Sequence, residues 1–304
     1  MSNSFFNQYR GVIYASITAL FWGFLAIALK VSLQFMPAIN IVWFRFIFAF
    51  FSLFLYFSFK QPKKLAILRK PPLLAILAAL GLSYNYIAFT TGIDLTSPNT
   101  AQVVMQIGPI LLAVIGFVVY KERINKFQLL GFAIAFIGLS IFYLNQIEGM
   151  IAEKASIFNQ GFLWVASGAL GWVFYASLQK HLVKLYHPQL LNLIIFAVPT
   201  LLFIPFINFS LFTALSIGQW LLMIFLGINT IVAYGFLALA FKYTQVNKVS
   251  VIISMNPILT FIAMTFLFYM DVQWIETSIM DLKTLVGAIL VILGAIFVIH
   301  FRRS

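Results

Sequence analysis

Two stretches of this 304-residue chain carry polar side chains at helical spacing inside otherwise apolar sequence. The first stripe consists of Asn99, Gln102, Gln106 and Pro109. The second lies 148 residues later and consists of Asn247, Ser250, Ser254 and Pro257. Intervals of three, four and three residues place each set on one face of a helix, and a proline frees the carbonyl four residues before it. Each stripe can bind a small polar solute, or it can tie helices together.

Large aromatic side chains occur at matching places in the chain. Trp22 and Trp172 lie in the middle of apolar stretches, away from the membrane interface where tryptophan normally collects. Tyr86 and Tyr234 are 148 residues apart, and Tyr175 follows Trp172 on the same helical face. Aromatic faces stack on planar ligands or hold cations. In a chain that is 17% aromatic, packing in the protein core is the alternative role.

One charged side chain lies well inside an apolar stretch. Arg45 is about six residues, or ~9 Å, from the outer end of its segment. An ionisable group inside a membrane is a functional candidate by default. It can bind a substrate carboxylate, extend outward to the interface, or tie helices together through backbone carbonyls.

Side chains for enzymatic chemistry do not gather anywhere in the sequence. The chain has no cysteine, and its three histidines, His181, His187 and His300, lack metal-ligand spacing. Paired carboxylates and a glycine-rich phosphate-binding loop are also missing. The sequence therefore predicts no catalytic residues, no metal site, no cofactor and no ATP hydrolysis by this chain.

The elements that must position these residues are membrane helices. The chain is 63% hydrophobic and 9% charged, whereas soluble domains are about 25% charged. The apolar residues form blocks of about twenty, the length that crosses a ~30 Å hydrocarbon core as a helix. We predict an all-α integral membrane protein with ten transmembrane helices, at about 11–29, 39–59, 72–90, 98–120, 127–145, 161–179, 189–208, 218–241, 247–270 and 284–301.

The basic residues predict the orientation of these spans. Fifteen of the nineteen lysines and arginines fall on one side, whereas Lys30, Lys154 and Lys283 fall on the other and Arg45 lies within a span. The positive-inside rule then places both termini in the cytoplasm. The net charge of +12 accordingly reports orientation in the bilayer, and we predict no binding to nucleic acid.

The two halves of the chain resemble each other. At an offset of 150 residues, seven of the twenty residues between Gly11 and Lys30 recur between Gly161 and Lys180. At other offsets, the sequence around Pro109 matches that around Pro257, and two pairs of glycines also correspond: Gly131 with Gly287, and Gly138 with Gly294. We expect these glycines to allow close approach of helices.

The repeat determines the relation between the halves. Each half holds five spans, an odd number, so the second half enters the membrane from the opposite side. We predict two inverted five-helix repeats, residues 1–146 and 147–304, which together form one membrane domain. Inverted repeats are typical of secondary transporters.

The order of these features is similar to that of the drug/metabolite transporter superfamily, specifically the EamA-like permeases. The resemblance rests on the following segments: Ala19-Leu20-Phe21-Trp22-Gly23, Phe44-Arg45-Phe46, Pro109, Pro257, Lys121-Glu122-Arg123, and Gly131 to Gly138 with its repeat. It implies ten helices in two repeats, a central cavity formed mainly by helices 1, 3, 4, 6, 8 and 9, alternating access, and transport of amino acids or other small metabolites. One departure is Phe268-Tyr269-Met270-Asp271, which lacks the Gly-Glu pair often found there.

We therefore predict a secondary transporter, not an enzyme, for amino acids or similar neutral or zwitterionic solutes. The alternative is a membrane scaffold or assembly subunit without transport activity. The predicted substrate site comprises Trp22, Tyr86, Asn99, Gln102, Gln106, Trp172, Tyr175, Tyr234, Asn247, Ser250 and Ser254, with helix kinks at Pro109 and Pro257 and a candidate charge site at Arg45. We expect a monomer or homodimer in a bacterial inner membrane, with the lipid bilayer and a small-molecule substrate as its partners.

Overall fold

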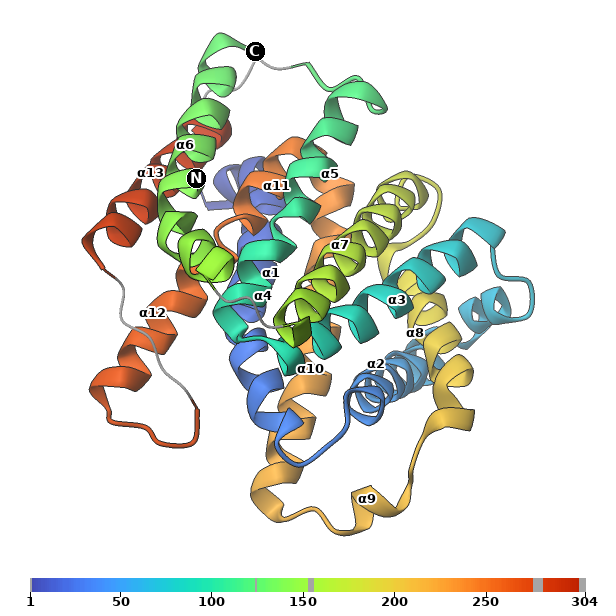
Figure 1. The fold of residues 1–304 in the computed structure, drawn as a ribbon. Helices are drawn as coiled ribbons and strands as arrows, with labels where there is room; N and C mark the ends of the chain where they lie inside the picture. Colours follow the sequence, from blue (N-terminus) through green and yellow to red (C-terminus); the bar gives the residue numbers. More distant parts are fainter. Residues whose placement is uncertain (1, 124, 153–155, 276–280, 301–304) are drawn as a thin grey trace.

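The computed structural model describes residues 2–123, 125–152, 156–275 and 281–300, and strands are absent from these residues. Figure 1 shows a bundle of tilted helices that cross one another. The helices of the first half are α1 (Ser2–Leu33), α2 (Ala38–Lys60), α3 (Leu73–Leu95), α4 (Pro98–Met105), α5 (Ile107–Val118) and α6 (Lys126–Ala152), with a 3₁₀ turn at Pro62–Leu68.

The second half repeats this order. Its helices are α7 (Ser156–Leu182), α8 (Pro188–Phe203), α10 (Ile217–Tyr243), α11 (Val246–Ile253), α12 (Asn256–Tyr269) and α13 (Leu282–His300). A 3₁₀ turn at Ile204–Phe206 and the short helix α9 (Ser210–Thr213) connect α8 to α10.

The predicted membrane spans are confirmed. In the described part of the chain, nine helical segments are long and apolar enough to cross a membrane, and a shorter apolar stretch at Lys126–Phe142 supplies the tenth. One connection differs from the prediction, because α6 continues to Ala152 and α7 begins at Ser156, within the segment 146–160 that we expected to be a loop. The segment is polar but contains no proline, so its helices can extend beyond the hydrocarbon core.

Two spans expected to be continuous, 98–120 and 247–270, are each broken into two helices. The breaks lie just before Pro109 and Pro257, which lack the backbone N–H that would continue the helix. The Gln106 N–H bonds instead to the Val103 carbonyl at 3.1 Å, and the Met255 N–H bonds to the Ile252 carbonyl at 3.2 Å. Equivalent positions in the two repeats therefore interrupt the helical backbone.

The helices pack in pairs that reflect a two-fold relation between the halves. α1 packs on α10 just as its counterpart α7 packs on α3, while α2 packs on α8 and α6 packs on α13. Figure 1 shows α6 and α13 side by side. A two-fold axis produces each contact in this reciprocal form. This reciprocal packing fits an architecture of two repeats.

Glycines set the separation of α6 and α13. A β carbon on Gly131 would lie 2.8 Å from the carbonyl oxygen of Gly294, and one on Gly138 would lie 2.8 Å from that of Gly287. Gly131 therefore lies against Gly294, the repeat counterpart of Gly138, and Gly138 lies against Gly287, the repeat counterpart of Gly131. The two backbones meet directly, as we expected from the glycine spacing.

Two lysines make the same contact at opposite ends of the bundle. Lys30 Nζ donates hydrogen bonds to the carbonyls of Ile93 and Thr96 at the end of α3, at 3.0 and 2.9 Å. Its counterpart, Lys180, donates to the carbonyls of Phe241 and Thr244 at the end of α10, at 2.8 and 2.6 Å. These two residues are the repeat counterparts of Ile93 and Thr96. A cation at a helix C-terminus satisfies carbonyls that lack helical partners.

Candidate functional site

A cavity of about 50 Å³ lies between the two repeats, near the middle of the bundle. Trp22, which lines it, lies near the middle of the apolar span Tyr9–Leu33, about 20 Å along the helix from Tyr9 and about 16 Å from Leu33. We call it the central cavity; its lining comprises Trp22, Leu25, Arg45, Asn85, Tyr86, Phe89, Gln102, Met105, Gln106, Pro109, Trp172, Tyr234, Ile253 and Asn256.

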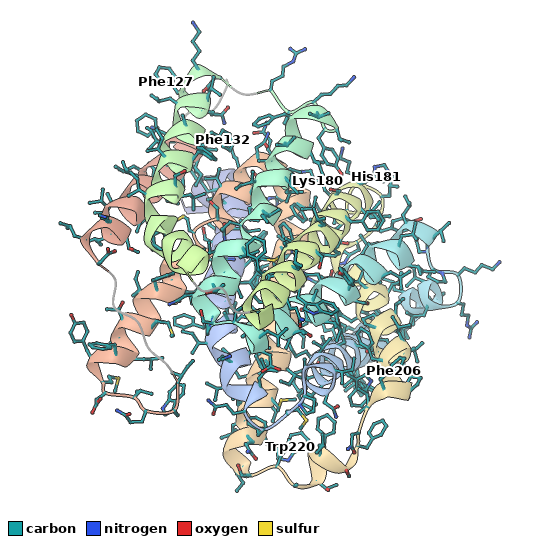
Figure 2. The ribbon with its side chains drawn as sticks, in the orientation of Figure 1. Phe127, Phe132, Lys180, His181, Phe206 and Trp220 are labelled. Atoms are coloured by element: carbon teal, nitrogen blue, oxygen red, sulfur yellow. The ribbon has the colours of Figure 1, made fainter. Side chains whose placement is uncertain are left out.

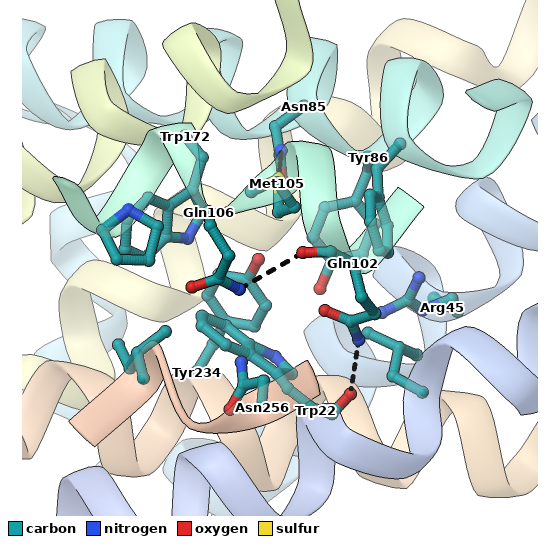
Figure 3. A pocket seen from close by; sticks show the side chains of 14 residues that line it. Trp22, Arg45, Asn85, Tyr86, Gln102, Met105, Gln106, Trp172, Tyr234 and Asn256 are labelled. Atoms are coloured by element: carbon teal, nitrogen blue, oxygen red, sulfur yellow. Dashed lines mark hydrogen bonds between the residues drawn. The ribbon is translucent and has the colours of Figure 1, made fainter. Parts of the chain in front are cut away.

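Aromatic rings from four helices form one wall of the central cavity (Figure 3). The ring of Trp22 meets those of Trp172 and Tyr234 edge-on, with centroids 5.9 and 5.2 Å apart. Tyr86 lies 5.6 Å from Tyr234. These contacts bring together residues of α1, α3, α7 and α10, so the wall is shared by both repeats.

Amide groups supply the polar part of the cavity. Gln102 Nε2 donates to the Trp22 carbonyl at 3.2 Å, and Gln106 Nε2 donates to the Gln102 carbonyl at 3.3 Å, as Figure 3 shows. Several buried atoms of the lining have no hydrogen-bond partner among the described residues, including Trp22 Nε1, Trp172 Nε1, Gln106 Oε1 and Asn256 Oδ1. A buried polar group without a partner costs about 1–3 kcal/mol. Their convergence on one cavity indicates a place where a solute or water supplies the missing partners.

Arg45 places its guanidinium beside the aromatic wall. Its Nε donates to Thr230 Oγ1 at 3.1 Å, and its Cζ lies 4.2 Å from the centre of the Tyr86 ring. The side chain is only 2% exposed, so it does not extend to the membrane interface. Nη2 has no partner within the described part of the protein, and no carboxylate belongs to the cavity lining. The arrangement joins α2 to α10 and leaves Nη2, with its two N–H groups, for an anionic group.

Eight of the residues singled out from sequence line the central cavity. They are Trp22, Arg45, Tyr86, Gln102, Gln106, Pro109, Trp172 and Tyr234. Six others do not line it, namely Asn99, Tyr175, Asn247, Ser250, Ser254 and Pro257. The structure thus brings together three of the four residues of the first polar stripe and most of the aromatic residues, whereas the second stripe lies elsewhere.

The second stripe packs between helices. Ser250 and Ser254 line a separate crevice between α5, α6 and α11. Asn247 lies against the backbone of Gly116, where a β carbon would come within 2.5 Å of its Oδ1. Tyr175 stands behind the cavity wall, with its ring 5.7 Å from that of Tyr234.

Several lining residues were absent from the predicted site. The apolar ones, Leu25, Phe89, Met105 and Ile253, give no sequence signal that separates them from other core residues. Asn256 could have been found, because it directly precedes Pro257 and is the repeat counterpart of Gly108.

A larger hollow opens at each end of the bundle. The outer vestibule, of about 770 Å³, is lined by Lys30, Gln34, Thr96, Ser97, Pro98, Phe268, Asp271, Val272, Gln273, Trp274 and Ile275. The basic vestibule, of about 620 Å³, is lined by Tyr120, Glu122, Arg123, Gln128, Lys180, Lys184, Lys242, Tyr243, Thr244, Gln245 and Lys248. In Figure 2, Lys180 lies toward one end of the molecule and Trp220 toward the other.

Comparison with known proteins agrees with the repeat and the fold. Residues 9–144 and 159–300 each match the EamA-like transporter family. The chain is 29% identical over 287 residues to an uncharacterized transporter of Haemophilus influenzae, which covers 94% of this chain and 93% of that protein. It is 31% identical over 291 residues to the uncharacterized inner membrane transporter YhbE of Escherichia coli, with coverage of 94% and 90%.

A solved crystal structure shares the fold. It superimposes with a TM-score of 0.72 and covers 95% of this chain and 97% of its own, at 17% sequence identity. The family match over both repeats and the similarity to YhbE along nearly the whole chain identify the protein. The chain belongs to the EamA-like transporter family and is a membrane transporter.

Proposed function

We propose that this transporter moves amino acids, or similar small solutes that carry a carboxylate, through the central cavity by alternating access. The observation that carries the proposal is the convergence of unpartnered polar atoms on a cavity between the two repeats. Such a site at the junction of repeats is where secondary transporters bind their substrates.

The cavity offers complementary groups for a zwitterion. Arg45 Nη2 is available to a carboxylate, and a guanidinium recognises this group well. Gln106 Oε1 and Asn256 Oδ1 accept hydrogen bonds, as an ammonium group requires. Trp22 and Trp172 cover an apolar or aromatic part of the solute. A sugar phosphate fits less well, because the lining holds a single cation.

Transport through this site requires a change of conformation. Trp172 is 1% exposed and both cavity glutamines are 4% exposed, so the polar part of the lining is buried, whereas Phe89 and Met105 are partly exposed. A volume of about 50 Å³ holds only a few water molecules. The breaks between α4 and α5 and between α11 and α12 give each repeat a point where half-helices can move separately.

We also place the protein in a bacterial inner membrane with both termini in the cytoplasm. The distribution of basic residues supports this orientation, and the name of the relative YhbE supports the location. The basic vestibule is then the cytoplasmic end of the pathway.

A binding screen tests the site. Purified protein in detergent is melted with amino acids, amines, nucleosides and sugar phosphates, because a ligand of the folded state raises the melting temperature. We expect one or more amino acids to stabilise the wild type and Trp164→Ala, a control at a half-exposed tryptophan on α7. The same solutes should not stabilise Trp172→Ala or Gln106→Ala.

Two results would count against the proposal. A solute that still stabilises both cavity variants binds elsewhere. A panel with no stabilising solute would contradict amino acids as the solutes of the central cavity and would favour hydrophobic drugs, lipids or the scaffold alternative.

A further inference from the structure

Two side chains of the first repeat bind the second repeat at the basic vestibule. The Tyr120 hydroxyl donates to the Ser177 carbonyl of α7 at 2.6 Å. The Glu122 carboxylate accepts the backbone N–H groups of Val246 and Asn247, with its Oε1 at 2.7 Å and its Oε2 at 3.0 Å. Both residues follow α5, so together they fix the end of α5 to α7 and α11.

The Glu122 contact is of a strong kind. The first N–H groups of a helix lack helical partners, and the helix dipole places partial positive charge there. Both carboxylate oxygens bind such groups at the start of α11, and hydrogen bonds to ionised acceptors are stronger than neutral ones. Glu122 is also half-buried, which limits competition from water.

The outer vestibule lacks this pair of contacts. The repeat offset of 148 residues places Phe268, which has no hydroxyl, at the position of Tyr120. Beyond the helices the offset becomes 150 residues, because the residue with a φ of 51° is Lys121 after α5 and Asp271 after α12. At this offset Met270, which also has no hydroxyl, takes the place of Tyr120, and Val272 takes the place of Glu122.

Other groups take over at this outer end. Asp271 accepts a hydrogen bond within its own connection, from Gln273 Nε2 at 2.9 Å. The start of α4 is capped inside its own repeat, where Ser97 Oγ accepts the Thr100 N–H at 3.1 Å. A hydrogen bond that does cross between repeats here, from Gln34 Nε2 to the Trp274 carbonyl, is neutral and exposed.

We propose that Tyr120 and Glu122 form a latch that holds the basic end of the pathway closed, so that the unliganded transporter opens preferentially at the outer end. Opening the basic end separates α5 from α7 and α11 and therefore breaks three hydrogen bonds. At the outer end, the described residues hold no carboxylate that binds the first N–H groups of a helix in the other repeat, so opening there breaks no such contact. The inference rests on the proposed alternating access, because a latch needs two alternative openings to choose between.

The chain has no cysteine, so a single introduced thiol reports accessibility without background. Met105→Cys places the thiol in the lining of the central cavity. A membrane-impermeant maleimide is added to vesicles of either orientation, which exposes the basic end or the outer end to the reagent. In the otherwise native chain we expect faster labelling from the outer end.

Removal of the latch should reverse this preference. In the Met105→Cys background we expect Tyr120→Phe and Glu122→Gln each to raise the labelling rate from the basic end about tenfold and to lower it from the outer end. Tenfold corresponds to about 1.4 kcal/mol, near the upper limit for a neutral hydrogen bond and near the lower limit for a hydrogen bond to a charged group. Two matched controls, Asp271→Asn at the outer connection and Tyr186→Phe at an exposed tyrosine, should leave both rates unchanged.

The outcomes separate the latch from the transport mechanism. If the cavity thiol is labelled from both ends at rates that neither latch variant changes, the latch is wrong and alternating access stands. If it is labelled from neither end in any variant, both proposals fail. Should Glu122→Gln not accumulate as folded protein, Tyr120→Phe carries the test alone, because it removes a single oxygen atom.

Discussion

Arg45 shows how one residue can serve the fold and the site together. A buried cation without a counter-ion is costly, and Thr230 and the face of Tyr86 stabilise it only in part. Nη2 has no partner, and the cavity that Arg45 lines contains no carboxylate of the described chain. A carboxylate brought by the solute would complete the set of partners, which links substrate chemistry to the stability of the closed state.

Arg45→Lys tests this role. Lysine keeps the charge but loses the planar fork of donors, so it cannot bind Thr230 and a carboxylate in the same geometry. We expect the affinity for stabilising amino acids to fall about 10- to 100-fold, equivalent to about 1.5–3 kcal/mol, while affinity for the corresponding amides changes little. Titration by thermal shift measures both. Arg10→Lys, at a guanidinium that covers Tyr243 outside the cavity, is the control; an equal loss for amides would contradict the assignment.

Tyr120 predicts how the latch responds to pH. Burial, and secondly the negative charge of Glu122, raise the pKa of Tyr120 to about 12. Only the protonated hydroxyl donates to Ser177, so this contact is complete below the ordinary pKa of about 10 and is lost as the pH rises through the raised value. Labelling rates at each pH are divided by the rate for a free thiol in solution, because maleimide reactivity itself depends on pH. We expect the ratio of the corrected rates from the two ends to stay constant between about pH 6 and 9. If this ratio of labelling rates changes between about pH 6 and 9, a group other than Tyr120 controls the latch.

At the scale of elements, the two broken spans show what sequence can and cannot predict. The polar stripes and their prolines were visible, and both helices do break before the proline. The sequence could not show that the first stripe faces the cavity while the second faces α5 and α6. The direction of α11 depends on tertiary contacts, such as Asn247 on the bare backbone of Gly116, which no periodicity encodes.

The contact of α6 with α13 yields a stability prediction. A β carbon on Gly138 would lie 2.7 Å from the backbone nitrogen of Val291 and 2.8 Å from the carbonyl oxygen of Gly287, so the helices must separate to admit it. We expect Gly138→Ala to destabilise the protein by about 1–3 kcal/mol, seen as a lower melting temperature. The same substitution at Gly218, where an added β carbon would meet no other group within 4 Å, is the control. Equal melting temperatures for the two variants would mean that the contact does not hold the helices together.

At the scale of the whole molecule, the hydropathy pattern and the internal repeat were sufficient to predict the architecture. Apolar length defines a membrane span, and the internal similarity defines two repeats, so neither conclusion needs side-chain packing. The volume and lining of the central cavity do need it. Apolar residues such as Met105 and Ile253 reach the cavity through the crossing of helices from both repeats, which the sequence does not specify.

The orientation of the bundle is testable with two surface cysteines. Ala66 lies in the exposed connection between α2 and α3, and Ser210 lies in exposed α9, on the opposite predicted side. In intact cells, an impermeant maleimide should label Ser210→Cys and spare Ala66→Cys, whereas permeabilised cells should be labelled at both. The reverse pattern would invert the assignment of the basic vestibule to the cytoplasm.

Release of solutes from proteoliposomes tests the central claim most directly. Vesicles that contain the purified protein are loaded with a mixture of amino acids, and the released solutes are identified over time by mass spectrometry. We predict selective release of one or a few amino acids by the wild type and by Trp164→Ala, and release at the rate of protein-free vesicles for Trp172→Ala. Release by the wild type that never exceeds that of protein-free vesicles, or selective release that survives Trp172→Ala, would contradict transport of amino acids through the central cavity.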